Sequence, residues 1–192
     1  MTPALERVFR DEYAQVVATL VRVLGDIGAA EDAVQDAFVV AGERWPRDGV
    51  PPNPAGWLVT TARRRAIDRH RRAVRERELV AVDEPDREEH PVPGDLLRLI
   101  FTCCHPALRT EHQIALTLRL LGGLTVEEIA RSFLVTEAAM AKRIVRAKHK
   151  VKVAGIPYRV PDPAELPNRL RSVLSVLSLI YNAGADDPAR AE

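Results

Sequence analysis

The 192-residue sequence lacks several features that would assign it to whole classes of protein. It has only two cysteines, Cys103 and Cys104, and because they are adjacent they cannot cross-link distant parts of the chain. No apolar run approaches the roughly 18–20 residues that a transmembrane helix needs. No basic cluster followed by an apolar stretch marks the N-terminus as a secretion signal. We therefore expect a cytoplasmic protein without a membrane span.

The sequence also lacks the residue groupings that indicate an enzyme. It contains no GxxxxGK[ST] phosphate-binding loop, and its five histidines are scattered along the chain. Cys103, Cys104 and His105 suggest a metal site, but adjacent cysteines are poorly spaced for tetrahedral ligation and no CxxC pair exists. A structural role is favoured, because cysteine is commonly buried and Cys104 falls on an apolar stripe. We expect no catalytic residues, no cofactor and no metal.

The net charge of +1 conceals a strong sorting of charges along the chain. Eight arginines lie between Arg63 and Arg77, and six basic residues with no acid lie between Lys142 and Lys152. Between them, six acids lie from Asp83 to Asp95. Two basic patches separated by an acidic segment suggest two modules that bind a polyanion. The alternative is that these charges only solvate helix surfaces.

Apolar residues recur with helical spacing over almost the whole chain, which predicts an all-α fold. We expect a first helical domain at 1–80 and an acidic, proline-containing linker at 81–94. A second helical domain follows at 95–155, and residues 156–192 form a proline-rich link and a C-terminal helix. The last helix carries a stripe too apolar to stand alone in water, so it requires a partner. This stripe comprises Leu170, Val173, Leu174, Leu177, Ile180 and Tyr181.

In the first domain, the spacing predicts a helix from about residue 29 to Trp45, ended by Pro46, and then a loop over 46–53. Asn53 is expected to cap a third helix that has Pro54 at its first position. The second helix presents Asp32, Gln35, Asp36 and Val39 on its outer side. The third presents an arginine-rich outer face: Trp57, Thr61, Arg64, Arg65, Asp68, Arg71 and Arg72. Trp57 either forms a stacking platform for bases or fills the core.

In the second domain, Thr125 and Glu128 form a capping-box motif at the start of a short helix. Thr136 is expected to cap the next helix, so that the two helices make a helix-turn-helix. The outer surface of the second helix is basic, as DNA binding requires. Its expected contact residues are Thr136, Lys142, Arg143, Arg146 and Lys148. The alternative is a tri-helical protein-interaction domain.

These segments, in this order, resemble an RNA polymerase sigma factor of the extracytoplasmic-function (group IV) type of the sigma-70 family. Residues 30–38 are similar to region 2.2, residues 56–68 to the start of region 2.4, and residues 124–148 to region 4.2. The chain departs from the family pattern at Arg64, where many relatives have Asn, and at Ala141, where many have Lys or Arg. The resemblance covers about residues 5–152.

The resemblance implies partners and roles for the residues named above. Asp32, Gln35, Asp36 and Val39 would bind the β′ clamp of core RNA polymerase. The loop at 46–53 and the arginine-rich face of the third helix would hold the melted −10 strand. The helix-turn-helix would bind the −35 duplex, with the β flap as a further polymerase contact.

Two further segments resemble a subgroup whose members continue into tetratricopeptide-like helical repeats. These segments are residues 103–106 and 177–182. The resemblance implies that residues 170–181 begin such an extension, and that a regulatory C-terminal domain or an anti-sigma partner controls the protein. Two other functions stay open: a helix-turn-helix repressor, and an inactive relative that acts as a protein-interaction module.

Overall fold

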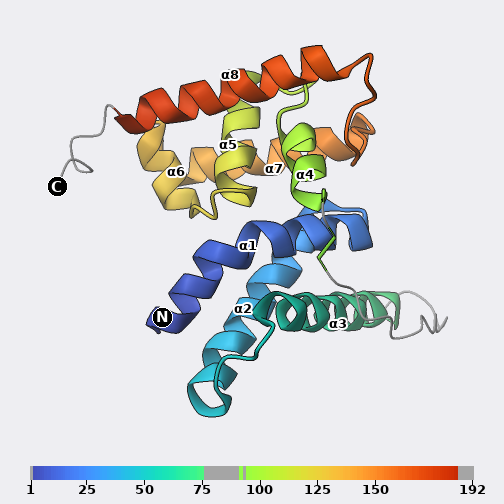
Figure 1. Cartoon of the computed structure of the whole chain (residues 1–192), viewed down its shortest axis with the longest axis vertical. Coiled ribbons are helices and arrows are strands. Elements are labelled where there is room, and N and C mark those ends of the chain that lie inside the picture. Colours follow the sequence, from blue (N-terminus) through green and yellow to red (C-terminus); the bar gives the residue numbers. More distant parts are fainter. Residues whose placement is uncertain (1, 76–90, 93, 186–192) are drawn as a thin grey trace. The chain divides into compact units, whose positions relative to one another are not determined.

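The computed structural model describes residues 2–75, 91–92 and 94–185, without the side chains of residues 70–75 and 184–185. Within these residues every regular element is a helix, so the predicted all-α fold is confirmed (Figure 1). The chain divides into two compact units, Met1–Leu96 and Leu97–Glu192. Most of the predicted linker at 81–94 lies outside the described residues.

The first unit is built from three long helices, α1 (Pro3–Leu24), α2 (Ile27–Asp48) and α3 (Pro54–Arg75), each packed against the other two. Their apolar sides meet in a common core, because each helix repeats apolar residues with a period near 3.6. Side chains that are completely buried there include Val16, Val17, Leu20, Val34, Leu58 and Val59. Burial of these residues therefore determines which residues of α2 and α3 lie on the outer surface.

Helix α2 is longer than predicted at both ends. It begins at Ile27 because Asp26 caps it, accepting a hydrogen bond from the Ala29 N–H at 3.0 Å. It also continues past Pro46 to Asp48, so the prediction that Pro46 ends the helix is wrong. A proline in the last turn removes one helical hydrogen bond, and the Gly49 N–H still donates to the carbonyl of the buried Trp45 at 3.0 Å. The loop is correspondingly shorter than 46–53.

The second unit contains the predicted helix-turn-helix. After α4 (Asp95–Cys103) and α5 (Thr110–Leu120), it is formed by α6 (Val126–Ser132) and α7 (Glu137–Val153). The capping box of Thr125 and Glu128 is present, with both reciprocal hydrogen bonds. Helix α7 buries the apolar side that its spacing predicts. These residues are Met140, Ile144, Ala147 and Val151.

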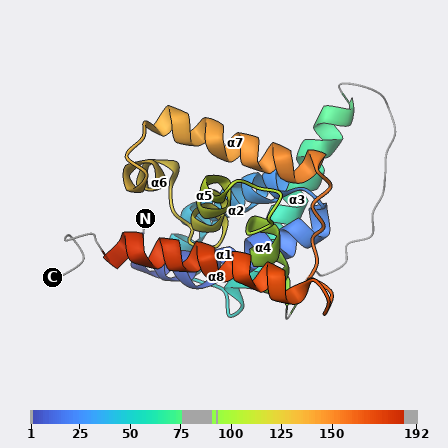
Figure 2. The ribbon, with the colours of Figure 1, turned by 90° about the horizontal axis from the view of Figure 1, so that it is seen from above.

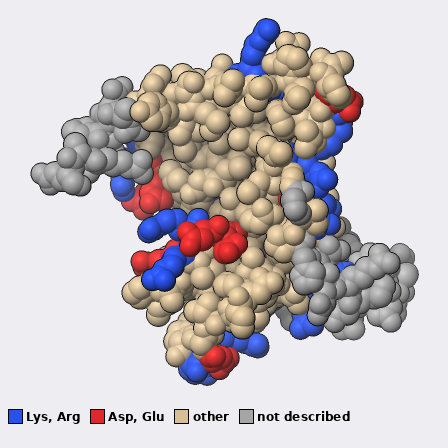
Figure 3. All heavy atoms as spheres, viewed as in Figure 1, with Lys and Arg blue, Asp and Glu red and all other residues tan. Residues whose placement is uncertain are grey.

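Helix α8 (Leu166–Ala185) divides its apolar residues between two environments. Val173 and Val176 are buried against Phe101 and Cys104. Helix α5 lies between α7 and α8, packed against both (Figure 2). Ile180 is half-buried against the same cluster. Most of the other apolar side chains are exposed, and Figure 3 shows a nearly uncharged surface over this helix. They include Leu170, Leu174, Leu177, Leu179 and Tyr181.

Only part of the predicted apolar stripe of α8 is therefore buried within the second unit, and the rest stays exposed. The sequence prediction omitted Val176, which is completely buried, and included Leu174, which is 54% exposed. None of the helices in the described part of the chain is long and apolar enough to cross a membrane.

The turn between α6 and α7 contains a strained leucine. Leu134 has φ +51° and is 93% exposed. The left-handed conformation costs an L-residue roughly 1–2 kcal/mol, whereas glycine adopts it freely at an entropic cost of roughly 0.5–1 kcal/mol. We predict that Leu134→Gly raises the free energy of unfolding by up to about 1 kcal/mol, measured by urea denaturation.

The control is Leu174→Gly, which changes an exposed leucine within helix α8 and is expected to lower the free energy of unfolding by roughly 1 kcal/mol. Equal destabilisation by the two substitutions would show that the turn at Leu134 stores no strain.

Candidate functional site

The outer side of α2 presents a polar surface around one apolar side chain. Asp32, Gln35 and Val39 are exposed, and Asp36 is half-buried. The Gln35 amide donates to the Glu31 carboxylate at 3.1 Å. Val39 is 62% exposed, whereas the apolar residues on the opposite side of α2 are buried in the core. We refer to Asp32, Gln35, Asp36 and Val39 as the α2 face.

The two acids of the α2 face contact an arginine of α3. The Arg69 guanidinium forms a short ion pair with Asp36, and its distance to the Asp32 carboxylate is 4.0 Å. The sequence prediction did not single out Arg69, because it lies in a run of arginines and more than thirty residues from its partners. Only the packing of α3 against α2 brings these charges together.

The N-terminus of α3 has the predicted cap, with the Gly56 N–H donating to the Asn53 side-chain oxygen at 3.0 Å. This cap fixes the start of α3, and the apolar side of the helix, with Leu58, Val59 and Ala62, is buried in the core. Of the predicted outward residues, Thr61 is half-buried, whereas Arg64, Arg65 and Asp68 are exposed. The side chains of Arg71 and Arg72 lie outside the described residues.

Trp57 occupies an intermediate position between the two roles considered for it. Its ring centroid lies 5.4 Å from that of Trp45, with the ring planes at 61°. Trp45 is buried, whereas Trp57 is only half-buried. The edge-on contact therefore anchors the Trp57 ring on the core and leaves part of it accessible.

The outer side of α7 is basic. The Thr136 hydroxyl caps the helix by accepting from the Ala139 N–H at 3.2 Å. Lys142 and Arg146 are exposed, and Lys148 is half-buried.

Arg143 differs from the other basic residues of α7, because its side chain is only 19% exposed. It forms an ion pair with Glu111 at 3.6 Å and lies 5.3 Å from the centroid of the Phe133 ring. These contacts orient Arg143 toward α5 and α6.

The two cysteines lie in the core of the second unit. Both are buried free thiols, and burial raises the pKa of each, most strongly that of Cys103. Partial burial, and next the positive charge of Arg169, lower the pKa of His105. The described residues include no cluster of three or more His, Cys, Asp or Glu side chains that could hold a metal ion.

We predict that Arg69→Gln changes the free energy of unfolding by less than about 1 kcal/mol, because Arg69 and its acid partners are partly exposed to solvent. Chemical denaturation measures this change. Leu58→Ala, in the adjacent core, is the control and is expected to cost roughly 2–5 kcal/mol. A loss for Arg69→Gln as large as that for Leu58→Ala would mean that the ion pair holds α2 and α3 together.

Two sequence families match the two units. Residues 8–76 match Sigma-70 region 2, and residues 98–151 match Sigma-70, region 4. The first match contains the α2 face and all of α3. The second contains the helix-turn-helix except for the last two residues of α7.

The similar proteins come from bacteria. The chain is 42% identical over 182 residues to the uncharacterized protein R00370 of Rhizobium meliloti, a match that covers 88% of the chain but only 43% of that relative. It is 30% identical over 148 residues to the ECF RNA polymerase sigma factor SigL of Mycobacterium tuberculosis, covering 73% of the chain and 83% of SigL. It is 28% identical over 143 residues to the ECF RNA polymerase sigma factor SigK of Mycobacterium bovis, covering 68% of the chain and 74% of SigK.

The chain thus spans less than half the length of the Rhizobium relative and most of the length of the mycobacterial ones. Both characteristic regions are present, region 2 before region 4. The chain belongs to the ECF sigma factors of the sigma-70 family.

Proposed function

We propose that this protein is a dissociable subunit that binds core RNA polymerase, directs it to promoters through their −10 and −35 elements, and helps to open the DNA. The observation that carries the proposal is that one chain combines sigma regions 2 and 4, each with its own exposed charged surface. The chemistry required is binding alone, since no covalent bond has to be made or broken.

The α2 face is proposed to bind the coiled coil of the polymerase β′ clamp. An exposed valine surrounded by polar groups is typical of a contact surface, because burying it on a partner recovers hydrophobic free energy. Asp32 and Asp36 would supply charge complementarity to a basic partner. Arg69 would then exchange its contacts with the two acids for contacts with that partner or with solvent.

The loop before α3 and the outer face of α3 are proposed to hold the melted −10 strand. Single-stranded DNA is bound by aromatic platforms together with basic groups that follow the phosphates. Trp57, anchored edge-on by Trp45, has the position of a platform, and Arg64 and Arg65 are exposed farther along the helix. Binding of the opened strand offsets the unstacking of the bases, which costs a few kcal/mol per step.

Helix α7 is proposed to bind the −35 duplex. The first residues of the helix offer few groups for hydrogen bonds to bases, since the Thr136 hydroxyl caps the helix and Ala138 and Ala139 follow. Specificity would therefore depend in part on DNA shape, with Lys142, Arg146 and Lys148 at the phosphates. Arg143 would act mainly by holding α7 in place.

The other partners predicted from the resemblance are also proposals. They are the polymerase β flap as a contact of the second unit, and a regulatory C-terminal domain or an anti-sigma protein. The greater length of the Rhizobium relative supports the presence of additional regions in proteins of this kind. The site of action would be the cytoplasm, where bacterial polymerase transcribes DNA.

A helix-turn-helix repressor is the second candidate, and the second unit alone would support it. A repressor binds duplex DNA without polymerase and is commonly a symmetric dimer. The match of residues 8–76 to sigma region 2 favours the initiation factor, because a repressor does not need that region.

We predict that Asp36→Arg abolishes specific run-off transcription with core polymerase, because it reverses a charge of the α2 face. Asp11→Arg makes the same change at an exposed position of α1 and is expected to retain transcription. Val39→Asp provides a second test, because it alters the α2 face without removing either acid from Arg69. Circular dichroism checks that each variant folds. Full transcription by both α2 variants would refute the assignment of this surface.

We also predict that Lys142→Gln weakens duplex binding similarly for all sequences and makes the dependence of log K on log salt less steep by about one unit. Arg171→Gln, at an exposed position of α8, is the control and should leave the slope unchanged. Fluorescence anisotropy over a range of salt concentrations measures both. An unchanged slope for Lys142→Gln would remove this residue from the phosphate contacts.

A further inference from the structure

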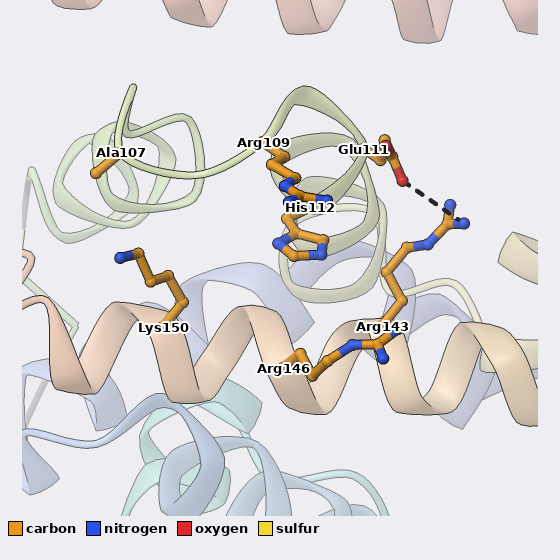
Figure 4. Close-up of a pocket in the computed structure, with 7 residues that line it drawn as sticks. All are labelled: Ala107, Arg109, Glu111, His112, Arg143, Arg146 and Lys150. Carbon is orange, nitrogen blue, oxygen red and sulfur yellow. Dashed lines mark ion pairs between the residues drawn. The ribbon is translucent and has the colours of Figure 1, made fainter.

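The second unit contains a cavity of about 690 Å³ between the N-terminal end of α5 and the middle of α7. Figure 4 shows Arg109, just before α5, and His112 of α5 extending toward α7, and Lys150 extending from α7 toward Ala107. The volume lies within the range of small-molecule sites, roughly 300–1,000 Å³. The lining residues are Ala107, Arg109, Glu111, His112, Arg143, Arg146 and Lys150. The sequence analysis assigned no role to Arg109, and it counted Lys150 only as one of the basic residues between Lys142 and Lys152.

The cavity has an excess of positive charge. Four cations and a histidine line it, against the single acid Glu111, and that acid is paired with Arg143 at 3.6 Å. Among the residues that the structure describes, no carboxylate forms an ion pair with Arg109, Arg146 or Lys150. Crowding like charges around a partly enclosed space is unfavourable, and an anion in that space would reverse the sign of the interaction.

The backbone at the start of α5 adds to the positive charge around the cavity. Helix α5 begins at Thr110, directly beside the cavity, and Arg109 in its N-cap position forms no side-chain capping bond. The N-terminal end of a helix carries a partial positive charge and favours a nearby anion. The helix end therefore adds to the positive charge that the side chains of Arg109, Arg146 and Lys150 bring to the cavity.

The pKa of His112 depends on burial and on the charges around the cavity. Partial burial lowers its pKa; among the neighbouring charges, Glu111 opposes this shift, whereas Arg109, Arg143 and Arg146 reinforce it. Lys150 of α7 also lines the cavity and adds positive charge there. A bound anion would favour the imidazolium form, so the pKa of His112 would rise and binding would take up a proton.

We propose that this cavity is a binding site for a phosphate group, held by Arg109, Arg146 and Lys150 with His112 as a fourth donor. Arginine and lysine are the side chains that bind phosphate most strongly, through charge-assisted hydrogen bonds. The phosphate belongs either to the DNA backbone or to a free phosphorylated small molecule. If the phosphate belongs to DNA, the proposal rests on the proposed contact of α7 with the duplex, which already includes Arg146. Titration with inorganic phosphate tests the site without DNA or polymerase, so its failure is distinguishable from failure of the proposed function.

The first experiment titrates inorganic phosphate into the full chain and follows the His112 ring proton by NMR, assigned by comparison with His112→Gln. We expect a saturable shift and a rise in the pKa of His112. The double variant Arg109→Gln/Lys150→Gln should weaken phosphate binding at least about tenfold, because it removes two charged donors. Both residues are exposed, so folding should be unaffected, and Arg171→Gln on α8 should bind phosphate as the unaltered chain does.

The second experiment identifies the source of the phosphate, using a 30-base-pair duplex of random sequence. If the site holds the DNA backbone, the double variant reduces the slope of log K against log salt by about two units. If phosphate binding is lost but the slope is unchanged, the ligand is a free phosphorylated small molecule. The absence of a saturable shift of His112, or equal phosphate affinity in the double variant, overturns the proposal whatever the duplex result.

Discussion

The structure depends on the burial of one apolar side of each amphipathic helix. In the first unit, α1, α2 and α3 supply completely buried valines and leucines to a shared core. In the second, α7 buries four residues at helical spacing against its neighbours. Because the apolar sides face inward, Asp32 of α2, Arg64 and Arg65 of α3, and Lys142 and Arg146 of α7 face outward. Burial therefore positions the surfaces on which the proposed function depends.

The charged surfaces are arranged in two different ways. On the first unit, Arg69 of α3 pairs with Asp36 and lies near Asp32, so the charge of these two acids is partly balanced before any partner binds. On the second unit, the cations between α5 and α7 greatly outnumber the single acid Glu111. Compensated charge adds little to stability at a surface, whereas uncompensated charge attracts a ligand of the opposite sign. This contrast is the reason for placing an anion site in the second unit.

Local signals in the sequence were sufficient for most of the helical architecture. The capping box of Thr125 and Glu128 and the caps at Asn53 and Thr136 depend on residues only three positions apart, so their hydrogen bonds follow from the sequence itself. The end of α2 was predicted incorrectly at Pro46. A proline near the end of a helix costs one hydrogen bond, and the buried Trp45 together with Gly49 keeps the last turn helical.

The sequence by itself determined the helical content, the buried apolar sides of α2, α3 and α7, and the likeness to sigma regions 2 and 4. Periodicity and capping are short-range, so they can be recognised without knowledge of neighbouring helices. Only the tertiary structure decided that Arg69 meets Asp36, that α8 buries Val176 rather than Leu174, and that Arg109 and Lys150 line one cavity. Those outcomes depend on how helices distant in sequence pack together, and the spacing along a single helix does not contain that information.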